Sequence, residues 1–158
     1  MCARCPLSHW LDPKSRREVW VIAGDRTRDW PAAVPWPSAT FGLLVLTEHV
    51  VDVDPLARPA LAQGLVFASA WGPGCELIEE AFDEIIARDR PDETSRDAVL
   101  TASHPDESLE ETLEFFLEIA TTAPAYDATC GAWVVFAMGP CVERVELALQ
   151  RRRATRRA

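Results

Sequence analysis

The sequence predicts an α/β domain, in which a mostly parallel sheet of about five strands lies between two layers of helices. From residue 41 onward, short apolar runs alternate with segments whose apolar residues have helical spacing. Such alternation is typical of a parallel sheet with helices on both faces. In addition, 48% of the 158 residues are hydrophobic, which is enough to bury the core of one domain. We therefore expect a three-layer sandwich of the flavodoxin- or Rossmann-like type.

The first forty residues follow this rhythm less closely. We expect residues 1–17 to form an irregular N-terminal segment ahead of a single domain over 18–150. The apolar run at 19–24 contains β-branched residues and predicts a strand. Three prolines follow it between residues 31 and 37, so we expect a long loop there. Because a parallel crossover normally needs a helix, we expect this first strand to be antiparallel or to lie at an edge of the sheet.

The rest of the chain divides into four strands and four helical segments. The apolar runs predict strands at 41–50, 65–71, 97–104 and 132–139. The intervening segments predict a short helix or turn at 54–64 and helices at 75–88, 108–123 and 141–155. Ser108 and Glu111 match the S-x-x-E capping box at the start of the third of these helical segments.

The charge distribution argues against a nucleic-acid partner. The chain has 25 acidic and 16 basic residues, and five of the basic residues are arginines of the tail at 151–158. The remaining 150 residues carry a formal charge of −14, which repels phosphate groups. We interpret the Arg-rich tail as a solubilising terminus.

The chain shows no sign of export or membrane insertion. No stretch approaches the roughly 18–20 apolar residues that span a bilayer, and the N-terminus has no apolar core of a signal peptide. We expect a cytoplasmic protein whose five cysteines are mostly free thiols.

Three segments that follow predicted strands carry the candidate functional residues. In an open α/β sheet, ligands bind at the carboxyl ends of the strands. Segments 71–75, 101–108 and 138–141 should meet there, and each leads into a helix whose free N–H groups favour an anion. The candidate binding residues are Trp71, Gly72, Gly74, Ser103, Asp106, Glu107 and Cys141.

Cys75 and His104 are the candidate catalytic residues. A thiol at a helix N-terminus can have a lowered pKa, and its thiolate is the reactive form. With His104 as base and Asp106 or Glu107 as its orienting group, Cys75 would act as a nucleophile. The competing interpretation is that Cys75 is a small buried residue and that His104 bonds the start of the next helix.

The sequence predicts neither a metal nor a cofactor. Cys2, Cys5 and His9 form C-x₂-C-x₃-H, but a structural zinc site needs four ligands and no second pair has a matching spacing. The glycine-rich motifs of dinucleotide- and phosphate-binding loops are absent, and so is the G-x-S-x-G nucleophile elbow.

Two motifs resemble a known family. W-G-P-G-C at 71–75 and T-A-S-H-P-D-E-S-L-E-E at 101–111 resemble a family of small uncharacterised bacterial proteins with W-G-P-x-C after a strand and H-x-x-E-S-L before an amphipathic helix. The resemblance covers roughly residues 40–140. It implies a compact bacterial α/β domain, and it assigns no catalytic residue.

Two hypotheses for the function follow. The first is a non-enzymatic module that binds a partner protein or a small ligand at the carboxyl edge of the strands. Trp30 and Trp36 would support it if they were exposed, although they could equally pin their loop to the core. The second is a cysteine-dependent hydrolase or transferase that uses Cys75 and His104. The sequence leaves the oligomeric state open.

Overall fold

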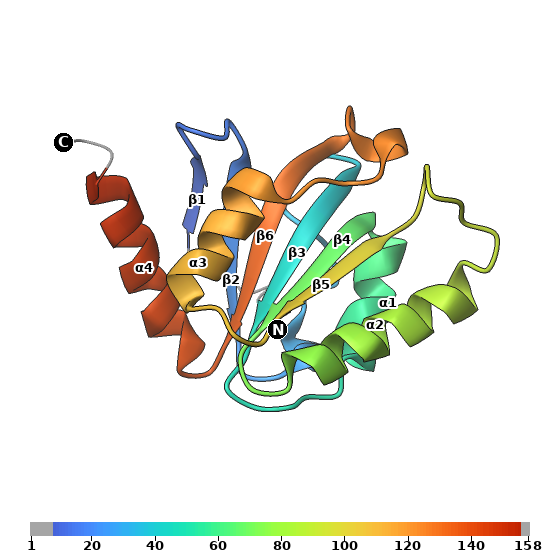
Figure 1. Ribbon diagram of the computed structural model, residues 1–158, viewed down its shortest axis with the longest axis horizontal. Coiled ribbons are helices and arrows are strands. Elements are labelled where there is room, and N and C mark those ends of the chain that lie inside the picture. The colour runs from blue at the N-terminus through green and yellow to red at the C-terminus, as the bar shows by residue number, and fades with distance from the viewer. Residues whose placement is uncertain (1–7, 156–158) are drawn as a thin grey trace.

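The structure, a computed structural model that describes residues 8–155, is built on one six-stranded sheet (Figure 1). The strands are β1 Ser8–Leu11, β2 Glu18–Gly24, β3 Thr40–Leu46, β4 Leu65–Trp71, β5 Leu100–His104 and β6 Cys130–Met138. The α-helices are α1 Asp54–Ala62, α2 Cys75–Asp89, α3 Leu109–Glu114 and α4 Cys141–Thr155. The shorter turns are η1 Thr27–Asp29, η2 Phe115–Ile119 and η3 Pro124–Tyr126. No helix within residues 8–155 is both long and apolar enough to cross a bilayer.

The sheet confirms the predicted α/β class, with a mostly parallel arrangement. Its order is β1-β2-β6-β3-β4-β5, and only β1 runs antiparallel to its neighbour. If the five parallel strands β2 to β6 are renumbered 1 to 5 along the chain, their order across the sheet is 1-5-2-3-4. This order differs from the flavodoxin-like 2-1-3-4-5 and from the Rossmann 3-2-1-4-5-6.

The helices cover both faces of the sheet and bury one core on each. On one face, α1 and α2 pack with the loop that joins β2 to β3, around Phe41, Phe82 and Phe136. On the other, α3, η2 and α4 pack around Phe116 and Val135. Successive strand residues point to opposite faces, so each continuous apolar strand supplies both cores.

β2 pairs antiparallel with β1, as one of the two predicted alternatives has it, but it lies inside the sheet and is parallel to β6, so it is not an edge strand. The last strand, β6, enters between β2 and β3 and pairs with both. The loop between β2 and β3 therefore crosses one strand position without a helix. It covers the sheet with two buried side chains, Trp30 and Trp36, which stack near Phe41. These tryptophans belong to the core and offer no exposed interface.

Residues 8–11 form a strand where we expected irregular chain. The four residues alternate between half-buried and exposed positions and pair with β2 through a tight turn. Asp12 closes that turn, because its backbone exchanges hydrogen bonds with Arg16 and Arg17 at 2.8 Å. The turn needs a left-handed residue and uses Arg16 (φ 61°) rather than glycine, which leaves no turn signal in the sequence.

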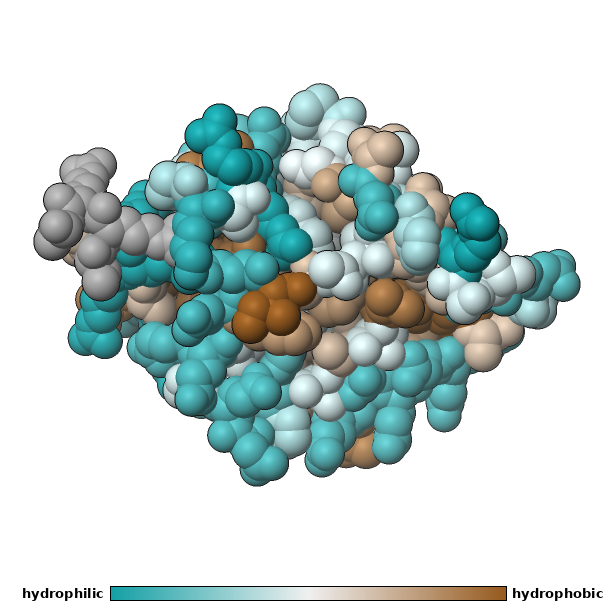
Figure 2. All heavy atoms as spheres, turned by 45° about the horizontal axis from the view of Figure 1, so that its top comes forward, coloured by the Kyte–Doolittle hydropathy of each residue, from teal (hydrophilic) through white to brown (hydrophobic). Residues whose placement is uncertain are grey.

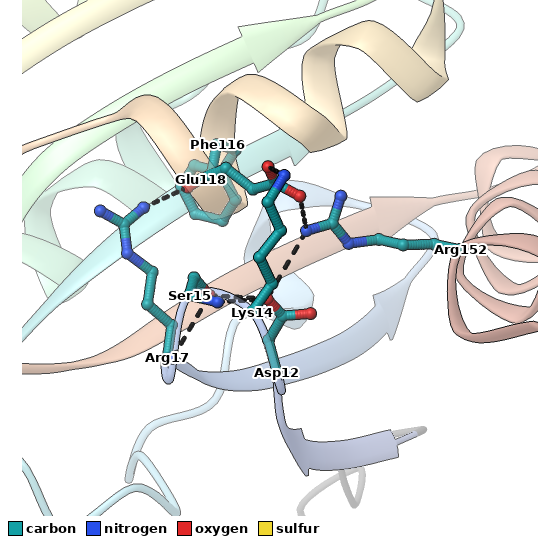
Figure 3. Close-up of polar contacts among 7 residues, drawn as sticks. All are labelled: Asp12, Lys14, Ser15, Arg17, Phe116, Glu118 and Arg152. Atoms are coloured by element: carbon teal, nitrogen blue, oxygen red, sulfur yellow. Dashed lines mark hydrogen bonds and ion pairs between the residues drawn. The ribbon is translucent and has the colours of Figure 1, made fainter. Parts of the chain in front are cut away.

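The third predicted helix ends earlier than residue 123. Its start matches the prediction, since Ser108 and Glu111 form the reciprocal capping box. After α3, however, the chain widens into the π turn η2, in which the Ala120 N–H donates to the Phe115 carbonyl at 2.8 Å. The guanidinium of Arg17 donates to the carbonyl oxygen of Phe116 at 2.8 Å (Figure 3). It also donates to the carbonyl oxygen of Ala120, the residue at which η2 ends.

Charged side chains tie the β1–β2 turn to η2 and α4 (Figure 3). Arg152 pairs with Glu118 and lies 3.5 Å from the carboxylate of Asp12. Lys14 pairs with the same Glu118 from the solvent side. Asp12 and Glu118 are largely buried, so their charges depend on these partners.

Candidate functional site

The carboxyl ends of the parallel strands form one edge of the molecule, as the sequence predicted. β3, β4, β5 and β6 run the same way, so segments 71–75, 101–108 and 138–141 lie along a single rim. The connection after β4 leads to α2 on one face, whereas the connection after β5 leads to α3 on the other. Adjacent connections that part in this way leave a crevice between the two strand ends.

A cavity of about 300 Å³ occupies this crevice. Loop residues 71–76 line one side, and His104, Pro105 and Glu107 line the other. Of the predicted candidates, this cavity therefore brings together Trp71, Gly72, Gly74, Cys75, His104 and Glu107.

Two glycines allow loop 71–76 to take its shape. Gly72 has φ 111°, and a Cβ there would lie 1.8 Å from the backbone oxygen of Thr47. Gly74 has φ 76° and caps α2, and a Cβ there would lie 2.2 Å from the side chain of Val50. Both positions combine a left-handed backbone with close contact, so the loop is fixed against the end of β3.

The His104 side chain is locked into a hydrogen-bonded chain. Its Nε2 lies 2.8 Å from the hydroxyl of Ser69, and its Nδ1 pairs with the carboxylate of Glu107. The indole N–H of Trp71 donates to the backbone oxygen of Glu107 at 2.9 Å. The imidazole also packs against Phe115 of η2, with ring centroids 4.9 Å apart. These contacts hold the β5–α3 loop rigidly against the end of β4.

Cys75 points to the opposite face from the His104 ring. The cysteine is 1% exposed and packs in the core beneath α2, whereas the imidazole faces α3 and η2. Burial raises the pKa of the Cys75 thiol, although a backbone N–H of His104 directed at the sulfur opposes the shift. The two residues are neighbours in space, but the imidazole is already engaged with Ser69 and Glu107.

Three predicted site residues do not line the cavity. Ser103 is half-buried in β5, on the α2 side of the sheet, and Asp106 is exposed in the loop after it. Cys141 begins α4 two strands away and is fully buried in the other core. Burial and the nearby Glu48 raise the pKa of its thiol to about 11.

Sequence reasoning missed two residues that matter here, Ser69 and Glu76. Ser69 is the single polar residue of the apolar run LVFASAW. That isolated hydroxyl was the sign in the sequence that a buried side chain, here His104, is its hydrogen-bond partner. Glu76 follows Cys75 in the first turn of α2 and lines the cavity with an exposed carboxylate.

The arrangement is suited to binding rather than to covalent chemistry. Ser69 and Cys75 are each 1% exposed, so neither can reach a substrate in this conformation. The exposed polar groups of the cavity are the carboxylates of Glu76 and Glu107. They dominate its electrostatics, because the N-terminus of α2 offers only about half of one positive charge.

Metal-binding groups are not assembled in the part of the chain between residues 8 and 155. No three side chains of His, Cys, Asp or Glu in that range come together as ligands. Cys2 and Cys5 of the C-x₂-C-x₃-H motif lie outside the described residues. His9 lies in β1, where its ring stacks on Trp20 at 3.7 Å.

Comparison with known proteins gives a family and no activity. The model of a family described as a domain of unknown function, DUF7684, matches residues 19–151. No curated protein and no solved structure matches the chain.

Proposed function

The chain belongs to the DUF7684 family, a domain of unknown function, and we propose that it is a non-enzymatic binding module whose ligand occupies the crevice between loops 71–76 and 104–107. One observation carries the proposal. The crevice lies where neighbouring connections leave the sheet on opposite faces, while its potential nucleophiles are buried beneath it. A rigid, lined cavity with exposed carboxylates and no accessible nucleophile favours recognition over catalysis.

The ligand is a cationic group, such as an amine or a guanidinium. Glu76 supplies a negative charge at the mouth of the cavity, and Asp106 adds an exposed carboxylate in the loop after β5. The carboxylate of Glu107 also lines the cavity and is shared with His104. Trp71 also lines the cavity. Because the guanidinium of Arg144 already lies over this ring, 4.9 Å from its centroid, the preference for a cation rests on the carboxylates.

The β4–β5 crevice is a better candidate than the equivalent position between β3 and β6. Connections also part there, since β3 leads to α1 and β6 leads to α4. At that position, however, Arg144 and Glu48 form an ion pair at 2.6 Å that links the two connections. The domain would therefore place its ligand by the same rule as flavodoxin- or Rossmann-like folds, although its strand order differs from theirs.

The test is a titration followed by the amide resonances of residues 71–76 and the indole resonance of Trp71. Agmatine is the cationic probe and acetate the anionic one. We expect agmatine alone to shift these resonances. Glu76→Gln should weaken binding about fivefold, since an exposed ion pair contributes about 1 kcal/mol at most. Glu80→Gln, an exposed position on the same helix outside the cavity, is the matched control. Shifts caused by acetate, or equal losses in both variants, would contradict the proposal.

We also infer a cytoplasmic location and a bacterial source. The location is supported by the state of Cys75, Cys130 and Cys141, which are free thiols. The source is supported by the resemblance of the motifs at 71–75 and 101–111.

A further inference from the structure

An apolar groove runs beside the outermost strand, β5, away from the crevice. It has a volume of about 610 Å³ and lies between β5 and the π turn η2. Its lining includes Phe67, Leu100, Ala102, Phe115 and Ile119. The side chain of Ile119 is 61% exposed. Figure 2 shows apolar surface between hydrophilic side chains near the middle of this side of the molecule.

β5 is a short edge strand that has no neighbouring strand on its outer side among residues 8–155. It pairs with β4 on one side and is the last strand in the sheet order. Natural edge strands are often blocked by lysine, proline or a bulge. The five residues of β5, LTASH, contain neither lysine nor proline, and their pairing with β4 is regular.

The two sides of β5 differ in chemistry. Leu100 and Ala102 face the groove and pack against the core beneath η2. Thr101 faces α2, where its hydroxyl donates to the carboxylate of Asp83 at 2.7 Å and lies 3.5 Å from that of Glu79. A strand added to β5 would therefore place alternate side chains on an apolar groove and on an acidic helix.

We propose that the open edge of β5 and this groove bind an extended segment of a partner protein by strand addition, and that the segment alternates apolar and basic residues. Backbone hydrogen bonds to β5 would supply the affinity, and the side-chain alternation would supply the specificity. This site adds to the proposed function and does not depend on the crevice.

Charge complementarity selects this occupant over a second copy of the chain. Residues 76–118 contain 15 acidic residues and three arginines, and they include β5 and α3 and nearly all of α2 and η2. Two copies joined edge to edge would bring these acidic segments together, which is unfavourable. A basic segment instead gains attraction from Asp83 and Glu79.

The test uses a fluorescein-labelled peptide that alternates lysine with valine and fluorescence anisotropy with the full chain at low salt. We expect saturable binding that Ile119→Glu weakens at least about tenfold, a cost of about 1.4 kcal/mol. Leu147→Glu is the matched control, because Leu147 is a similarly exposed apolar residue on α4. Ile119→Glu should leave the shifts that agmatine causes at residues 71–76 unchanged, which separates this site from the crevice.

Two further probes decide whether the mode is strand addition. Peptides N-methylated on alternate amides should fall into two sets, one that loses binding and one that keeps it, because only one edge of an added strand pairs with β5. Equal binding by both sets would overturn the proposal. So would a concentration-dependent dimer, detected by sedimentation, that Ile119→Glu dissociates and the peptide does not.

Discussion

At the scale of single residues, the two cysteines that begin α2 and α4 have the same role in different cores. Each follows a Gly-Pro turn or its variant, is almost fully buried, and has a raised thiol pKa. A cysteine fits there because it is small and apolar and carries no group that needs a strong hydrogen bond. Their recurrence at helix starts therefore reflects packing.

The reactivity of Cys75 tests that interpretation. With iodoacetamide and site-resolved mass spectrometry, we expect Cys75 to react at least about a hundredfold more slowly in the folded chain than in urea, because the reagent needs a local opening. The rate should keep rising as the pH passes 9, since burial raises the pKa and disfavours the thiolate. Cys141, equally buried, is the internal reference. Rapid labelling that levels off near pH 7 would instead support the cysteine-dependent enzyme.

Sequence alone predicted which residues gather at the rim, but not on which face of the sheet each side chain lies. The strand ends at 71 and 104 were correctly placed, so Cys75 and His104 were expected to be neighbours. Which side of the sheet each side chain takes depends on the parity of the strand and on the shape of the turn after it. Cys75 follows a three-residue connection, 72–74, that returns it to the α2 side, whereas His104 still belongs to its strand.

At the scale of elements, the π turn η2 is held by a residue that is distant in sequence. Arg17 donates to two of its carbonyl oxygens and stacks on Trp133, with its guanidinium carbon 3.8 Å from the ring centroid. A π turn is poorly stable by itself and often occurs at functional sites. Here it forms one wall of the groove and carries Ile119 into solvent.

Replacing Arg17 should loosen this element. We expect Arg17→Lys to lower the free energy of unfolding by about 1–3 kcal/mol, because an ammonium cannot donate to both carbonyls while it stacks on the indole. Urea denaturation measures the loss, and hydrogen exchange at residues 115–120 should show faster opening. The exposed neighbour Arg16 gives the control, Arg16→Lys, which should change neither. Equal losses in both variants would contradict the anchoring role of Arg17.

Elements with strong local signals were predicted well. The strand at 65–71 and the helix at 141–155 have the expected bounds, because apolar periodicity and Gly-Pro turns define them locally. β1 and η2 were missed since their conformations depend on partners far along the chain, β2 and Arg17 respectively.

At the scale of the whole molecule, charge is divided between the two ends of the sheet. Acidic residues concentrate on α2 at the β5 edge, whereas Lys14, Arg17, Arg144 and Arg151 to Arg153 lie on the β1–β2 turn and on α4 at the other edge (Figure 1). There, Arg151 and Arg152 pair with Glu110 of α3 and Glu118 of η2. The acidic end repels itself, and this repulsion opposes folding at low ionic strength.

A charge reversal at the acidic end should therefore stabilise the fold. Glu80 and Glu84 are exposed one turn apart on α2. Glu80→Lys should raise the free energy of unfolding by about 0.3–0.5 kcal/mol at low salt, since it converts the repulsions with Glu76 and Glu84, each four residues away, into attractions. The gain should shrink in about 0.5 M NaCl, which screens exposed charges. Glu146→Lys on α4 is the counterpart at the basic end and should give no gain. An equal gain in the free energy of unfolding from Glu146→Lys would contradict the prediction, because the stabilisation would then not depend on the acidic surroundings of α2.

The strand order was beyond sequence reasoning. Local pattern predicts that strands exist, but pairing between residues far apart in the chain decides which strands become neighbours. β6 is such a case, because it pairs with β2 and β3 across more than eighty residues of intervening chain.

The insertion of β6 between β2 and β3 has a consequence during biosynthesis. Until residues 130–138 have left the ribosome, the β1–β2 hairpin and the β3-β4-β5 unit have no strand to join them, and each presents an unpaired apolar border. The sheet can therefore close only once β6 has been made, and until then both borders are open to non-native pairing.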